Sequence, residues 1–137
     1  MKVLEHPDIW SVDMKVIAKE LQDPVAMVDF IDSYNSAVKN IIKNPCPPSN
    51  ALNRSLTGWY KEKFHKEIPP PSGQNPQYRI IYQLSKDQTK IRILVVARRI
   101  DDKANNHQKV LPDGTVQQDG YQVAAFRPKN ANYQKKK

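Results

Sequence analysis

Three cationic or titratable side chains recur at every second position near the middle of the chain: Lys61, Lys63 and His65. Alternate residues of a β-strand point to the same face, so a strand over residues 59–66 would place all three in one row. Further along, Arg79 lies within the apolar segment 78–84 and Arg99 ends the aliphatic segment 91–99. If these segments pair with the first strand, both arginines can join the row. Such a surface suits a phosphate backbone and could support chemistry on one.

The two arginines carry more information than the two lysines. Alternating lysines are typical of a solvated face or of a protected edge strand. An arginine inside an apolar run needs a reason, because the interior of a sheet rarely accepts a charge. Arg98 and Arg99 are adjacent, so one of them must point to each face of the strand.

Three strands are predicted to position these side chains, over residues 59–66, 77–85 and 90–99. The last two should form an antiparallel hairpin around the tight connection at residues 85–89. The proline-rich segment 69–76 predicts an exposed, stiff loop between the first two strands.

The N-terminal part predicts a strand and a long helix. Residues 9–16 alternate between apolar and polar types, which favours a first strand that can run into a short helix over 16–21. Asp23 followed by Pro24 is a helix-start signal, and the apolar spacing that follows predicts one amphipathic helix over Pro24–Lys43. The prolines from residue 45 onward should end it. Beyond residue 100, residues 121–126 favour a short strand, and the lysine-rich end at 130–137 favours disorder.

The composition favours one domain with an anionic partner. The chain has 137 residues and a formal net charge of +8, which suits nucleic acid, the ribosome, a membrane surface or an acidic protein, although simple solubility is the plainer explanation. Cys46 is the single cysteine, which fits a reducing cytoplasm. No apolar run resembles a signal peptide or a membrane span. The three histidines, His6, His65 and His107, lack ligand spacing, so we expect no zinc site.

The order of these features resembles the RelE/ParE superfamily of bacterial toxins, especially its RelE ribonuclease branch. The resemblance covers residues 9–100. It rests on a helix followed by Asn44-Pro45, then Gly58-Trp59-Tyr60-Lys61-Glu62-Lys63, then Tyr78-Arg79-Ile80-Ile81-Tyr82, and an aliphatic strand ending in Arg99. It implies an α+β fold: a small twisted antiparallel sheet of about four strands, with N-terminal helices packed on one face. The toxin domain that it implies covers residues 1–100. Beyond this domain we expect a C-terminal extension over 101–129, packed on or beside it, and a disordered basic tail over 130–137.

The resemblance further implies a function. RelE-like toxins are endoribonucleases that cut mRNA on the ribosome without a metal or another cofactor, and an antitoxin neutralises them. The 2′-hydroxyl attacks the adjacent phosphate, which requires a base, cations for the phosphorane and an acid for the leaving oxygen. On this resemblance, Lys61, Lys63, Arg79 and Arg99 are the expected catalytic cations, and His65 could add an acid or base. Trp59, Arg98 and His107 are the expected further RNA contacts.

The chain also departs from the family pattern. The family often has a tyrosine or histidine shortly after the terminal arginine, and here His107 is the nearest candidate, unless Tyr121 folds back. This departure and the extended tail favour an alternative without catalysis, either a ParE-like inhibitor of DNA gyrase or a basic nucleic-acid-binding protein. The two lysines and two arginines favour the ribonuclease. A structural protein whose charge only aids solubility is a third possibility.

Overall fold

A five-stranded mixed sheet forms the centre of the computed structural model, which describes all residues 1–137. Its strand order is β2-β3-β4-β1-β7. The parallel neighbours are β1 and β4, whereas the other neighbouring pairs are antiparallel. A separate hairpin is formed by β5 and β6. The strands are β1 (Lys2–Glu5), β2 (Tyr60–Phe64), β3 (Tyr78–Leu84), β4 (Lys90–Arg98), β5 (Gln108–Val110), β6 (Val116–Gln118) and β7 (Gln134–Lys135).

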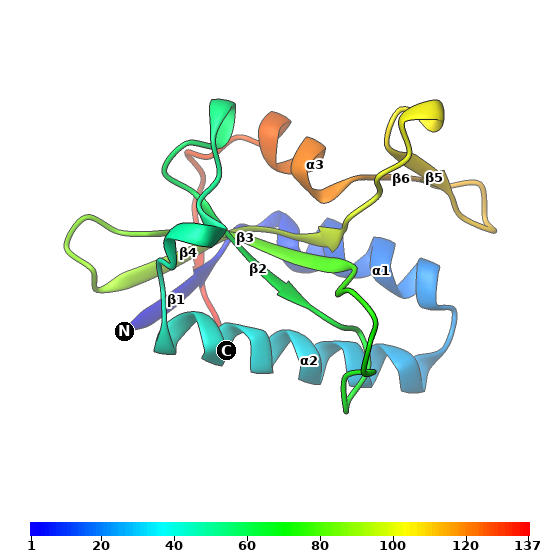
Figure 1. Cartoon of the computed structure of the whole chain (residues 1–137), viewed down its shortest axis with the longest axis horizontal. Coiled ribbons are helices and arrows are strands. Elements are labelled where there is room, and N and C mark those ends of the chain that lie inside the picture. Colours follow the sequence, from blue (N-terminus) through cyan, green and yellow to red (C-terminus); the bar gives the residue numbers. More distant parts are fainter.

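Helices cover both faces of this sheet. The helices α1 (Met14–Leu21) and α2 (Pro24–Lys43) lie on one face, and the short α3 (Gly120–Phe126) lies on the other (Figure 1). The predicted α+β class is confirmed, as are three of the predicted strands and their hairpin. The sheet differs from the expected antiparallel one because the N-terminal strand β1 enters it parallel to β4.

The long helix α2 is confirmed with the predicted bounds. The Asp23 side chain accepts a hydrogen bond from the Val25 amide at 3.0 Å, which caps the first turn, and Pro24 takes the first helical position. Phe30, Tyr34 and Ile41 are fully buried on the face toward the sheet. No helix of the chain combines the length and the apolar character needed to cross a bilayer.

The prediction of a strand over residues 9–16 is wrong. Ile9–Asp13 forms a π-helical turn that runs directly into α1. Ile9, Asp13 and Ile17 are buried at helical spacing, whereas Trp10 and Val12, which suggested alternation, are about half exposed. The alternation therefore reflected exposed apolar residues and not a buried strand face.

Two separate cores result from the two covered faces. The larger core joins α1 and α2 to side chains such as Phe64, Tyr78, Ile80 and Ile93. The smaller core lies under α3 and joins Trp59, Ile81, Leu94, Val95 and Ala124.

The C-terminal part of the chain completes the sheet. The predicted strand over residues 121–126 is wrong, because Asp119 caps a helix there: its side chain accepts from the Tyr121 amide at 3.0 Å. The segment 130–137, expected to be disordered, contains β7, which pairs with β1 at the sheet edge. The lysine-rich composition did not reveal this, since backbone hydrogen bonds to β1, not side-chain burial, hold the two-residue strand.

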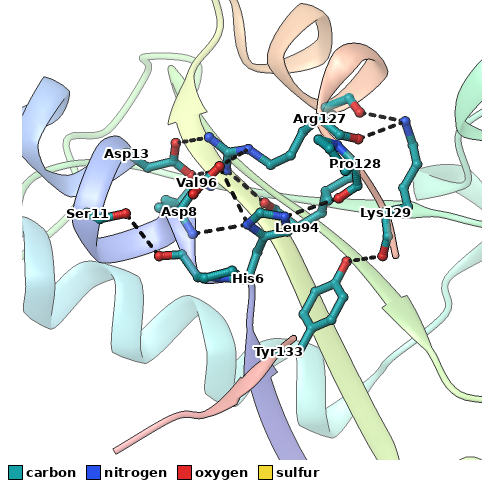
Figure 2. Close-up of polar contacts among 12 residues, drawn as sticks. His6, Asp8, Ser11, Asp13, Leu94, Val96, Arg127, Pro128, Lys129 and Tyr133 are labelled. Carbon is teal, nitrogen blue, oxygen red and sulfur yellow. Dashed lines mark hydrogen bonds and ion pairs between the residues drawn. The ribbon is translucent and has the colours of Figure 1, made fainter. Parts of the chain in front are cut away.

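A buried ion pair fastens this C-terminal part to the start of the chain. Arg127 donates to both carboxylate oxygens of Asp13, at 2.7 and 2.8 Å (Figure 2). Asp13 also accepts from the Val96 amide at 3.1 Å, and Arg127 donates to the Leu94 carbonyl at 2.9 Å. These two backbone groups lie beyond Ile93, the last residue of β4 that pairs with β1. The ion pair thus supplies hydrogen-bond partners to backbone groups of β4 at the point where β1 ends.

Candidate functional site

Three of the predicted cations share one face of the sheet. Lys63 and Arg79 are direct cross-strand partners on β2 and β3, and Lys61 lies opposite Ile81. Ile81 belongs to the core under α3, and alternate residues of a strand share a face. Lys61, Lys63 and Arg79 therefore lie on the face that α3 covers.

A β-bulge in β4 brings Arg99 to the same face. Ile81 pairs with Val95 and Tyr82 pairs with Ile93, so Leu94 is an extra residue in β4. Before the bulge, the odd-numbered Ile91 and Ile93 face α1 and α2, but after it the even-numbered Val96 does. The bulge thus turns Arg98 toward α1 and Arg99 toward α3. The strand ladder continues to this point, since the Arg99 amide donates to the Gln77 carbonyl at 2.7 Å.

Tyr121 folds back onto these cations from α3. Its hydroxyl accepts a hydrogen bond from Arg79 Nε at 3.1 Å, and the Arg99 guanidinium lies 6.0 Å from its ring centroid. We name Lys61, Lys63, Arg79, Arg99 and Tyr121 the cationic cluster.

The two residues before Tyr121 explain its position. Asp119 accepts from the Ile100 amide at 2.6 Å and so ties the start of α3 to the end of β4. Gly120 is buried against β4, where an added Cβ would stand 3.3 Å from the Ala97 Cβ. A glycine therefore permits the close approach of α3 to the sheet.

The Arg79 guanidinium is enclosed. The residue is 4% exposed. Its Nη1 donates to the carbonyls of Pro76 and Tyr78 at 2.8 and 3.0 Å. With Nε bound to Tyr121, only Nη2 has no protein partner. Arg79 therefore anchors Tyr121 and offers at most one nitrogen to a ligand while α3 stays in this position.

Lys61 has the most perturbed electrostatic environment of the cluster. Burial lowers the pKa of its ammonium group, and the positive charges of Arg79 and Arg99 lower it further. Lys63 and Arg99 are exposed, and Arg99 forms a surface ion pair with Asp101 at 3.6 Å. The cluster thus combines a lysine biased toward its neutral form with two accessible cations.

The remaining predicted site residues lie elsewhere. His65 follows β2 and lines a recess with Gln77 and Tyr78. Trp59 is buried in the core under α3, which leaves its ring little surface for a base. Arg98 lies on the opposite face and donates to Glu20 of α1 at 2.9 Å. The His107 ring contacts the Ile100 carbonyl at 3.2 Å, just after the end of β4.

Sequence reasoning left the position of Tyr121 open. The dipeptide Asp119-Gly120 is typical of a turn, but aspartate before a helix is also an N-cap signal. An N-cap reading would have predicted a helix with Tyr121 in its first turn. Its contact with Arg79, 42 residues earlier, has no local signal in the sequence.

No three His, Cys, Asp or Glu side chains come together in a group that could hold a metal ion. The ligand chemistry of the cluster is cationic and suits an anion such as a phosphate.

Comparisons with known proteins give one structural likeness. No protein-family model matches the chain, and no curated protein matches it. Among solved structures, the chain is similar to a YoeB/ParE toxin from Agrobacterium tumefaciens, with 15% sequence identity and a TM-score of 0.46. The similarity covers 72% of this chain and 99% of that toxin. It concerns the fold alone.

Proposed function

We propose that the chain is a RelE-like toxin, an endoribonuclease that cleaves mRNA at the ribosome without a metal and is neutralised by an antitoxin. The observation that carries this proposal is the cationic cluster, in which Lys61, Lys63 and Arg99 lie on the same sheet face as a tyrosine hydroxyl bound to Arg79. The cluster offers the three kinds of group that attack by a 2′-hydroxyl on a phosphate requires.

Each group has a chemical role in the proposed reaction. Neutral Lys61 accepts the proton of the 2′-hydroxyl while that oxygen bonds to phosphorus. Lys63 and Arg99 stabilise the added negative charge on the phosphorane oxygens. The bond from phosphorus to the 5′-oxygen then breaks, leaving a 2′,3′-cyclic phosphate.

Tyr121 is the proposed acid for the leaving 5′-oxygen. Its oxygen accepts from the Arg79 cation, so its own proton remains available for donation. His65 remains an alternative acid, although the structure places it in a separate recess.

The test is an in vitro translation reaction with the purified protein, followed by mapping of the mRNA ends. We expect 5′-hydroxyl and cyclic phosphate ends, which are the products of attack by the 2′-hydroxyl, and loss of cleavage by about 10²–10⁴-fold in Lys61→Met. The matched control is Lys66→Met, which removes an exposed lysine just beyond β2. Intact mRNA with the native protein, or equal loss in both variants, contradicts the proposal.

The enclosed state of Arg79 favours a second candidate, a non-catalytic protein that binds nucleic acid or inhibits DNA gyrase. With Arg79 4% exposed under Tyr121, the surface accessible to a phosphate is smaller than the full cluster. A supercoiling assay distinguishes the two candidates: inhibited gyrase with intact mRNA supports the second, and cleaved mRNA with active gyrase supports the first.

A further inference from the structure

A second group of cations crosses the other end of the sheet. In the strand register, Lys2 of β1 lies opposite Lys90 of β4, and Leu4 lies opposite both Arg92 of β4 and Lys135 of β7. Directly opposed residues share a face, and so do residues two apart. Lys2, Lys90, Arg92 and Lys135 therefore form one continuous surface, which we name the basic strip.

The basic strip lies on the same face of the sheet as the cationic cluster. Val3 packs against the core of α1 and α2, so its neighbours Lys2 and Leu4 point to the opposite face. Gln83 of β3 pairs with Arg92 and is four residues from Arg79 on the same strand. Lys61 pairs with Ile81, two residues from Gln83, so the nearer end of the strip begins about 7 Å along the strand from Lys61 and about 13 Å from Arg79. Ile81, of the core under α3, lies between the strip and Arg79.

The strip cations have no carboxylate partners. None of the four forms an ion pair, in contrast to Arg98, Arg99 and Arg127 elsewhere in the fold. The carboxylate in the adjoining turn, Asp87, is held by Ser85 and Thr89. Glu5 of β1 belongs to the opposite face, where Trp10 and Tyr34 donate to it. Asp87 acts on Lys90 through its nearby charge without forming an ion pair, so the uncompensated charges of the strip are those of Lys2, Arg92 and Lys135.

One side chain of the strip is held in place by a neighbouring aromatic ring. The Arg92 guanidinium lies 5.9 Å from the ring centroid of Tyr133, which restricts its orientation. An open recess beside it is lined by Lys129 and by the amide side chains of Asn130 and Asn132. Lys2, Arg92 and Lys135 are exposed.

We propose that the basic strip binds the sugar-phosphate backbone of single-stranded RNA that extends from the cationic cluster. This proposal rests on the proposed function, which supplies RNA as the ligand, and extends that function to a second contact region. A backbone is favoured over an acidic protein segment because the strip is polar: Leu4 is partly buried and Tyr133 is partly covered. Protein interfaces usually need exposed apolar or aromatic anchors.

The test measures binding of a fluorescent 2′-O-methyl oligonucleotide of about 12 nucleotides, which cannot be cleaved, over a range of salt concentrations. The strip variant combines Lys2→Gln, Arg92→Gln and Lys135→Gln. The control variant combines Lys15→Gln, Lys39→Gln and Lys43→Gln, exposed lysines of α1 and α2. Both remove three positive charges, so a general effect of net charge changes both equally.

We expect the strip variant to bind more weakly, with a salt slope reduced by about 2, because each lost phosphate contact removes about 0.7 from the slope on single strands. The control should keep the native slope, and a variant with Lys2→Arg, Arg92→Lys and Lys135→Arg should recover it. Thermal unfolding of all variants checks that the fold is intact.

Two separate measurements distinguish this proposal from the proposed function. The function is tested by cleavage of mRNA in the translation reaction, and the strip is tested by the salt slope of binding to the oligonucleotide that cannot be cleaved. Intact mRNA in the translation reaction, together with a salt slope that falls only in the strip variant, contradicts the function and supports the strip. Equal salt slopes in the strip and control variants contradict the proposal that the strip binds RNA. The proposal is also contradicted if the strip variant loses binding to polyglutamate and keeps binding to RNA.

Discussion

At the scale of single residues, the main finding is that chemistry can be shared between distant parts of the chain. Lys61, Lys63 and Arg79 come from β2 and β3, whereas the hydroxyl that accepts from Arg79 belongs to Tyr121 on α3. The cations could be predicted because strand alternation is a local property. The position of Tyr121 could not, because it depends on how α3 packs against β4.

The first prediction concerns the Tyr121 hydroxyl. Tyr121→Phe keeps the ring against Arg99 and removes the oxygen that accepts from Arg79. We expect cleavage to fall by about 10²–10⁴-fold through loss of an acid, while the free energy of unfolding falls by about 1 kcal/mol. End mapping and chemical denaturation check the two effects. Unchanged cleavage in this variant would return the role of acid to His65.

The second prediction concerns His6, which is buried where the chain's two ends meet. Its Nδ1 accepts from the Asp8 amide at 3.0 Å and its Nε2 faces the Pro128 carbonyl at 3.1 Å, so the neutral ring satisfies both groups (Figure 2). Burial lowers the pKa of His6. The folded protein therefore binds fewer protons than the unfolded chain just below the ordinary value of about 6.5.

This difference in proton binding sets the direction in which stability changes with pH. The contribution of His6 to stability is complete above about pH 6.5 and is lost as the pH falls toward the lowered pKa. His6→Gln should flatten the decline in the free energy of unfolding between about pH 7.5 and about pH 5.5. Chemical denaturation at several pH values measures this decline in the native protein and in the variant. A decline as steep as that of the native protein assigns the effect to other groups.

At the scale of elements, the bulge in β4 decides which arginine joins the cationic cluster. Alternation shows only that Arg98 and Arg99 point apart. It was the resemblance that assigned Arg99 to the cluster, and the extra residue Leu94 supplies the physical reason. A bulge inside an aliphatic run has no compositional signal, since every residue there is apolar. The π-helical turn at Ile9–Asp13 differs for another reason, because its polar and apolar residues alternate with the period of a strand.

The third prediction tests the ion pair that satisfies the edge of β4. Arg127→Met leaves Asp13 buried without its partner, and we expect a loss of about 3–5 kcal/mol in the free energy of unfolding. Burial raises the pKa of Asp13, and Arg127 opposes that rise, so the variant should regain stability when Asp13 is protonated at low pH. Arg54→Met, an exposed arginine in a turn, is the control and should change stability little.

The double variant Asp13→Leu with Arg127→Met removes the uncompensated charge. It should be more stable than Arg127→Met alone, although the Val96 amide and the Leu94 carbonyl then lose their partners. A double variant whose loss equals the sum of the single losses means that the two charges do not interact.

At the scale of the whole molecule, the residues after position 100 are part of the main fold. They supply α3 over the smaller core, Arg127 for Asp13, and β7 for the sheet edge. The expected division into a domain over residues 1–100 and an added extension followed the limits of the resemblance. Composition gives no signal for a tail that closes a sheet, because the contacts involve few residues far apart in sequence.

The fourth prediction is that a fragment of residues 1–100 does not fold stably. Without α3, the side chains of Ile81, Leu94 and Val95 would be exposed to water, and Asp13 would be left without Arg127. Circular dichroism and amide NMR dispersion measure the outcome. A fragment of residues 1–128, which keeps α3 and Arg127 but loses β7, is the control and should fold with reduced stability. A well-dispersed spectrum for residues 1–100 would show that the domain is independent.

The ion pair between Asp13 and Arg127 also sets an order of events during protein synthesis. The two residues are separated by 114 positions, so a growing chain carries Asp13 long before Arg127 has been added. The sheet edge that this pair closes, and the helix that holds Tyr121 against Arg79, can form only when synthesis has passed α3. For a protein proposed to cut the message on the ribosome, this order means that each molecule assembles its site after most of its own message has been translated.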